Sequence, residues 1–112
     1  MIVRTLGRTG YRVSAVAYGG IVSMNDSQAD SDRYVAYAVE QGVNYFDVAP
    51  TYGDAQQKLG QSLIPYRDRV YLACKTAQRR RREAEQDLRR SMELLRTDHF
   101  DVYQLHGLST DE

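Results

Sequence analysis

The chain has 112 residues, of which 42% are hydrophobic and 27% are charged, and its 15 Lys and Arg balance its 15 Asp and Glu. This composition excludes an intrinsically disordered chain, and the zero net charge disfavours a general attraction to nucleic acid or to an anionic membrane. No stretch approaches the roughly 20 apolar residues that span a bilayer, and the single cysteine, Cys74, excludes an internal disulfide. We therefore expect a cytoplasmic protein that forms one small domain or part of a larger one.

The first twenty residues alternate short apolar runs with glycines. Residues 2–13 have an apolar run on each side of a turn that contains Gly7 and Gly10, which predicts a β-hairpin. Residues 14–18 are small and mostly apolar, and they predict a buried strand. That strand ends at the glycine pair 19–20, where we expect a loop whose backbone must stay uncrowded.

The rest of the chain alternates helical and strand patterns. Ser27 is a suitable cap for the first helix and Gly42 a suitable stop. The alternation predicts a parallel sheet with right-handed crossovers, either a doubly wound sheet or the start of a (β/α)8 barrel. The predicted helices cover residues 27–41, 55–63 and 82–95, and the predicted strands cover residues 43–49, 69–75 and 100–106.

Four polar residues fall at or just beyond the carboxyl ends of predicted strands. Asp47 lies near the end of the second strand, Lys75 closes the third and His106 closes the fourth, while Tyr52 follows Asp47 in a loop. In parallel α/β folds, catalytic groups collect at this edge of the sheet. We therefore expect these four side chains to meet.

These residue types together suit carbonyl reduction. A tyrosine hydroxyl has an ordinary pKa of about 10, and a neighbouring lysine ammonium lowers such a pKa by stabilising the phenolate. A carboxylate paired with the lysine keeps the ammonium charged, and an imidazole can hydrogen-bond a carbonyl oxygen. The set therefore predicts a general acid directed at a carbonyl group.

Three separated segments carry a resemblance to a known family. Residues 46–53 (FDVAPTYG), 72–76 (LACKT) and 101–106 (DVYQLH) resemble the motifs of the aldo-keto reductases in order and spacing, and residues 4–10 are similar to the family's N-terminal hairpin. The resemblance implies an α/β fold, the N-terminal part of a (β/α)8 TIM barrel. Residues 1–112 would form a single partial domain with a hairpin, three βα units and a fourth strand.

The resemblance also implies an activity, an NAD(P)H-dependent reduction of an aldehyde or ketone to an alcohol. It makes Tyr52 the proton donor, Lys75 the modulator of its pKa, Asp47 the partner of Lys75, and His106 the group that orients the substrate. Gly20 and Asp47 would lie near the nicotinamide ribose. The implied cofactor is NADP(H), the implied partner is a small carbonyl substrate, and no metal, nucleic acid or membrane is expected.

The length of the chain bears on this activity. A complete barrel of this kind has about 250 residues, whereas this chain ends six residues after His106. We interpret it as an N-terminal fragment of a bacterial-type member that lacks most of the phosphate and adenine site and is inactive alone. Some bacterial members carry a further iron–sulfur domain downstream. Substrate identity, the choice between NADPH and NADH, and oligomeric state stay open.

Parts of the sequence are also compatible with other functions. The same scaffold serves as a non-catalytic binding or regulatory protein in the potassium-channel β subunits, which resemble this family. In another barrel enzyme, Lys75 would form a Schiff base, or Asp47 and His106 would bind a metal. The arginine run 79–82 would be a nucleic-acid patch. Acidic residues follow it directly, so we interpret it as a solvated helix start, and we expect Cys74 to be a small buried residue.

Overall fold

The computed structural model describes residues 1–110, so Asp111 and Glu112 at the end of the predicted domain lie outside the described part. Its centre is a four-stranded sheet in the order β3-β4-β5-β6, with every neighbouring pair parallel. The strands of this sheet are β3 (Tyr18–Gly19), β4 (Tyr45–Asp47), β5 (Tyr71–Thr76) and β6 (Val102–Leu105). The helices are α1 (Gln28–Glu40), α2 (Ala55–Ser62) and α3 (Arg81–Leu94), with short 3-10 turns η1 (Gly20–Ser23) and η2 (Arg67–Arg69).

The residues predicted to begin and end the first helix do so in the structure. The Ser27 side chain accepts a hydrogen bond from the Asp30 backbone N–H and caps α1, as predicted. Gly42 has a φ of +93°, a left-handed conformation that favours glycine and ends the helix. The three predicted helices and the last three predicted strands are all confirmed, with ends that differ from the prediction by at most two residues.

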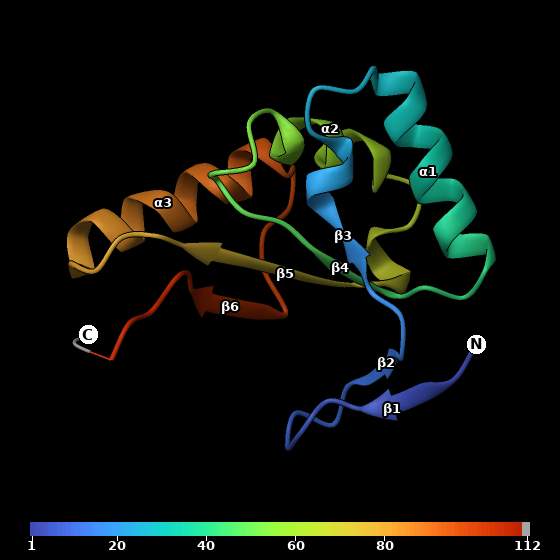
Figure 1. Ribbon diagram of the computed structural model, residues 1–112, viewed down its shortest axis with the longest axis horizontal. Coiled ribbons are helices and arrows are strands. Elements are labelled where there is room, and N and C mark those ends of the chain that lie inside the picture. Colours follow the sequence, from blue (N-terminus) through green and yellow to red (C-terminus); the bar gives the residue numbers. More distant parts are fainter. Residues whose placement is uncertain (111–112) are drawn as a thin grey trace.

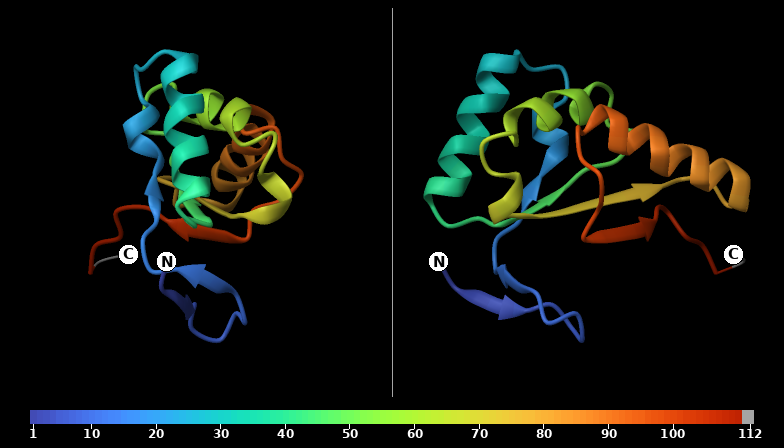
Figure 2. Two further views of the ribbon diagram at one scale, coloured as in Figure 1. Left: turned by 90° about the vertical axis from the view of Figure 1, so that its right-hand side faces the viewer. Right: turned by 180° about the vertical axis from the view of Figure 1, so that it is seen from behind.

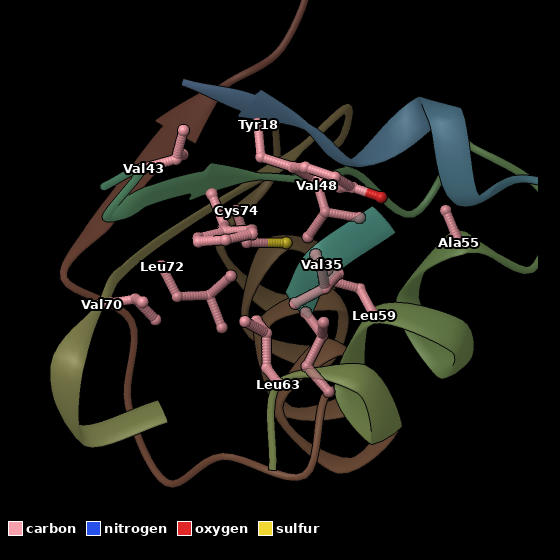
Figure 3. Close-up of a cluster of buried hydrophobic side chains, with 12 residues drawn as sticks. Tyr18, Val35, Val43, Val48, Ala55, Leu59, Leu63, Val70, Leu72 and Cys74 are labelled. Atoms are coloured by element: carbon pink, nitrogen blue, oxygen red, sulfur yellow. The ribbon is translucent and has the colours of Figure 1, made fainter. Parts of the chain in front are cut away.

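The three helices cover one face of the sheet (Figures 1 and 2). Between helices and sheet lies a core in which Phe46, Leu72 and Val35 are fully buried. Leu59 and Leu63 of the α2 region belong to the same cluster, which Figure 3 shows. Burial of these side chains is the main favourable term for the fold. Among the described residues no helix is long and apolar enough to cross a membrane.

The N-terminal hairpin lies at the end of the sheet opposite the candidate site. Its strands β1 (Val3–Thr5) and β2 (Arg12–Ser14) pair antiparallel, which confirms the predicted hairpin. Tyr11 stacks on Tyr71 with ring centroids 4.6 Å apart, and the Asn44 side chain donates to the Arg12 carbonyl. Tyr71 begins β5 and Asn44 precedes β4, so the hairpin contacts the amino ends of the strands and leaves their carboxyl ends open.

The predicted buried strand over residues 14–18 is wrong. Only Tyr18 and Gly19 pair with the sheet, while Ser14 belongs to the hairpin and Val16 is 56% exposed. Residues 15–17 link the hairpin to the sheet, and the Ala15 N–H bonds back to the Ile2 carbonyl instead of to a sheet strand. Small apolar residues fit a buried strand and a connector equally well, so the pattern did not distinguish them.

Candidate active site

The strand register brings the predicted residues to one edge of the sheet. Asp47 is the last residue of β4, Lys75 the penultimate residue of β5, and His106 follows β6 directly. The backbone N–H of His106 donates to the Thr76 carbonyl at 2.8 Å, which fixes the end of β6 against the end of β5. All three side chains therefore start from the carboxyl edge, as the sequence predicts.

An ion pair between Lys75 and Asp47 forms the centre of this site. Lys75 Nζ donates to Asp47 Oδ2 at 2.6 Å, and the two side chains are only 12% and 28% exposed. Burial by itself lowers the pKa of the Lys75 ammonium, but the hydrogen bond and charge of Asp47, together with Tyr52, outweigh it and hold that pKa above its ordinary value. The amine therefore stays protonated at neutral pH.

Tyr52 and His106 complete the cluster. The Tyr52 hydroxyl lies 3.5 Å from Lys75 Nζ, at the outer limit of a hydrogen bond, and the ammonium lies 5.5 Å from the centre of the tyrosine ring. The His106 imidazole meets that ring edge-on, with centroids 6.1 Å apart and planes at 84°. One cation thus touches the carboxylate and the hydroxyl, and an imidazole lies beside the tyrosine ring.

One oxygen of Asp47 has no partner. Oδ2 accepts from Lys75, whereas Oδ1 is buried and makes no hydrogen bond with any described residue. A buried acceptor without a donor costs free energy, so this oxygen has capacity for a ligand hydroxyl. Gly20 packs against the same residue, since a Cβ at position 20 would lie 2.5 Å from the Asp47 carbonyl oxygen.

The sequence prediction for Cys74, which directly precedes Lys75 in β5, is confirmed. Cys74 points into the core with 0% exposure, and burial raises the pKa of its thiol, which keeps it protonated. Residues 79–82 are all exposed at the entry to α3, where Arg80 is the residue before the helix. Across residues 1–110, His, Cys, Asp and Glu side chains form no group of three or more that could hold a metal ion.

A polar connection beside Tyr52 was not predicted from the sequence. The Asp54 carboxylate binds both Lys58 on α2 and the backbone of Asn25 on the neighbouring loop. Two signals were available, because Lys58 is one of only two lysines in the chain and stands four residues after Asp54. That spacing favours an ion pair on one helix face, but the partner at residue 25 could not be read from it.

The chain is similar to known proteins over nearly all of its length. The model of the aldo/keto reductase family matches residues 16–111. Aldo-keto reductase YhdN of Bacillus subtilis is 29% identical over 91% of this chain, which covers 37% of that protein. Among solved structures, the holo form of aldo-keto reductase AKR11C1 from Bacillus halodurans superposes with a TM-score of 0.86 at 28% identity, covering 100% of this chain and 42% of that one. An aldo-keto reductase from Klebsiella pneumoniae in complex with NADPH gives 0.77 at 26% identity, covering 95% and 40%.

These matches fix the class of the fold. Three βα units and a fourth parallel strand, with polar residues at the carboxyl edge, are the N-terminal part of a (β/α)8 barrel, in which residues 1–110 do not close the sheet. The chain belongs to the aldo-keto reductase family. It spans about two-fifths of the length of the relatives described above.

Proposed function

We propose that this chain supplies the proton-donating half of an NADP(H)-dependent reductase that converts an aldehyde or ketone to an alcohol. One observation carries the proposal: a partly buried ammonium, that of Lys75, lies between the carboxylate of Asp47 and the hydroxyl of Tyr52. A reductase needs such a group, because the oxygen of the carbonyl gains a proton as its carbon gains a hydride. The rest of the barrel would complete the site.

Within this site Tyr52 is the general acid. Its hydroxyl donates a proton to the carbonyl oxygen, and the positive charge of Lys75 stabilises the tyrosinate that remains. Asp47 keeps Lys75 charged and in place. The His106 imidazole, beside the Tyr52 ring, donates a hydrogen bond that orients the same carbonyl oxygen. When bound, NADP(H) supplies the hydride for the carbonyl carbon.

Two features of the site fit a nicotinamide cofactor. The unpartnered Oδ1 of Asp47 is suited to accept a hydrogen bond from a ribose hydroxyl. Gly20 lets the backbone at the end of β3 pack close to Asp47, where any side chain would collide with the Asp47 carbonyl. The NADPH complex of the Klebsiella relative supports the same class of cofactor. We propose that Gly20 and Asp47 contact the nicotinamide ribose.

The geometry favours a reductase over a Schiff-base enzyme. A lysine that forms a Schiff base reacts as the neutral amine and is activated by desolvation or a neighbouring cation. Lys75 has the opposite environment, since Asp47 lies 2.6 Å from it and the pKa of the ammonium is raised. A protonated lysine is suited to stabilise a tyrosinate and unsuited to attack a carbonyl.

The test is the exchange Tyr52→Phe in a complete barrel, made by joining this chain to the remaining strands of the Bacillus halodurans relative. Turnover of a generic aldehyde should fall by about 10²-fold or more, while the Kd for NADPH stays the same. Tyr37→Phe, at a 65% exposed position on α1, is the matched control. Retained turnover in Tyr52→Phe would refute the role of Tyr52.

A second measurement compares NADPH binding and turnover by residues 1–112 alone with those of the complete barrel. Residues 1–112 alone should quench NADPH fluorescence weakly or not at all and should oxidise no NADPH with an aldehyde, because the proposed contacts to the phosphates and adenine lie elsewhere in the barrel. Saturable quenching with steady NADPH oxidation would contradict this division of the site. A complete barrel that binds a protein partner but reduces no carbonyl would favour the regulatory function instead.

A further inference from the structure

The segment that carries Tyr52 has few hydrogen bonds to the sheet. The Val48 N–H donates to the Ala73 carbonyl of β5, and beyond that point the bonds are local, from Tyr52 N–H to the Ala49 carbonyl at 3.2 Å and from Ala55 N–H to the Tyr52 carbonyl at 3.0 Å. Local turns of this kind set the shape of a loop but not its position relative to β5. The Tyr52 ring packs against the buried core, and a polar contact also holds the loop that carries it.

That contact comes from one carboxylate two residues after Tyr52. Asp54 Oδ1 accepts from the Asn25 backbone N–H at 2.8 Å, and Asp54 Oδ2 accepts from Lys58 Nζ at 2.7 Å. Lys58 Nζ also donates to the Asp26 carbonyl. We call this set the Asp54 clamp: the side chains of Asp54 and Lys58 with the backbone N–H of Asn25 and the carbonyl of Asp26. It joins the loop after β4 to the loop before α1.

The two loops also fit together sterically. Asn25 has a φ of +66°, in the left-handed region that only a minority of non-glycine residues adopt, so its N–H is presented to Asp54 by an unusual turn. Gly53 has a φ of +55°, and a Cβ on it would lie 2.8 Å from Cγ of Met24. Met24, directly before Asn25, thus packs against Gly53, directly after Tyr52.

The charged partner of the clamp is held in place as well. The Lys58 side chain is 20% exposed, far less than that of Arg33, which is 73% exposed in the surface pair with Asp30. The Lys58 backbone carbonyl accepts from the side chain of Gln28 on α1 at 3.0 Å. Fixed in this way, Lys58 makes a firmer anchor for the carboxylate than a solvated surface lysine.

We propose that Asp54 and Lys58 are positioning residues for Tyr52, which set the distance from its hydroxyl to Lys75 and His106. The Tyr52 hydroxyl is already at the 3.5 Å limit from Lys75 Nζ, so a small displacement of the loop would separate the two groups. The catalytic meaning of this placement rests on the proposed function. The placement itself is a property of the chain and can be measured without turnover.

The test uses NMR on the 112-residue chain labelled with ¹³C at tyrosine Cζ. Asp54→Ala should speed hydrogen exchange of the Tyr52 amide by about tenfold or more and shift its ring Cζ signal. Asp54→Asn keeps an acceptor for the Asn25 N–H but loses the charge, so it should give a smaller effect. Asp30→Ala removes a carboxylate of the same 42% exposure and should leave both signals unchanged.

Two results would refute the positioning role of Asp54 and Lys58: unchanged Tyr52 signals in Asp54→Ala, or equal changes of these signals in Asp30→Ala. Lys58→Met gives a second route if Asp54→Ala does not fold, and it should move the Tyr52 signals in the same direction. In the complete barrel, Asp54→Ala should lower kcat while the Kd for NADPH is kept. Full turnover in Tyr52→Phe would instead refute the proposed function and leave the NMR result standing.

Discussion

The exchange Asp47→Asn tests how much the negative charge of Asp47 contributes to the site, because it replaces only one carboxylate oxygen by an amide group. It removes the negative charge opposite Lys75 but keeps the size of the side chain and one oxygen that can accept a hydrogen bond. The Lys75 side chain, only 12% exposed, then has a neutral oxygen and the Tyr52 hydroxyl at 3.5 Å as its remaining partners. The folded state should therefore lose stability, and the lysine should become easier to deprotonate.

The size of the loss follows from the geometry. At an N–O distance of 2.6 Å, Coulomb attraction is about 6 kcal/mol with an effective dielectric constant of about 20. Part of it is recovered, because the asparagine introduced at this position still accepts a hydrogen bond and both side chains keep some contact with water. We expect a net loss of about 2 kcal/mol in the free energy of unfolding at pH 7, somewhat below the range for a fully buried pair that loses one partner.

The pH dependence gives a sharper signature than the loss itself. In the native chain the pKa of Lys75 is raised above 10.5, so the ion pair stabilises the fold below that pH and its contribution disappears as pH rises through the folded-state pKa. Without the Asp47 charge, burial lowers the pKa of Lys75, the unfolded state binds more protons, and stability rises with pH. The difference between the two chains should therefore shrink as pH approaches 10.5.

Urea unfolding followed by circular dichroism at about pH 7, 9 and 10 measures this difference. Glu85→Gln is the control, because it breaks a 2.7 Å pair with Arg89 whose side chains are 50% and 71% exposed, and it should cost less than about 0.5 kcal/mol. A loss below that value for Asp47→Asn, or one that stays constant over the whole pH series, would show that Asp47 does not compensate the buried charge.

The other predictions concern stability and use the same assay. Gly60→Ala should cost about 1–2 kcal/mol despite the helix propensity of alanine, because its Cβ would lie 2.5 Å from the Leu94 carbonyl oxygen, whereas the open Gly19→Ala should be neutral. Asp101→Ala removes the acceptor of a β5 backbone N–H and should cost about 2 kcal/mol. Burial raises the pKa of Tyr103 to about 12, so Tyr103→Phe should reduce the loss of stability between about pH 10 and 12. Equal losses of stability in Gly60→Ala and Gly19→Ala would contradict the first prediction, and an unchanged stability in Asp101→Ala the second. The third fails if Tyr103→Phe loses as much stability between about pH 10 and 12 as the native chain.

The amino-acid sequence determined the order of elements and the edge at which the site forms. Each helix signal is local: Ser27 caps α1 within three residues, and Gly42 ends it with its own backbone. Once strands and helices alternate, the strands run parallel and their carboxyl ends meet. The meeting of Asp47, Lys75 and His106 therefore follows from their places in the chain.

Only the tertiary structure decided which distant groups touch. The Asp54 clamp joins residues about 30 positions apart. Oδ1 of Asp47 lacks a partner because Lys75 binds the other carboxylate oxygen. The close approach at Gly60 depends on how α2 packs against the end of α3. The exposed connector at Val16 has the same composition as a buried strand. Local propensity acts over a few residues, whereas these contacts depend on how whole elements pack, and packing distances are set by every side chain between them.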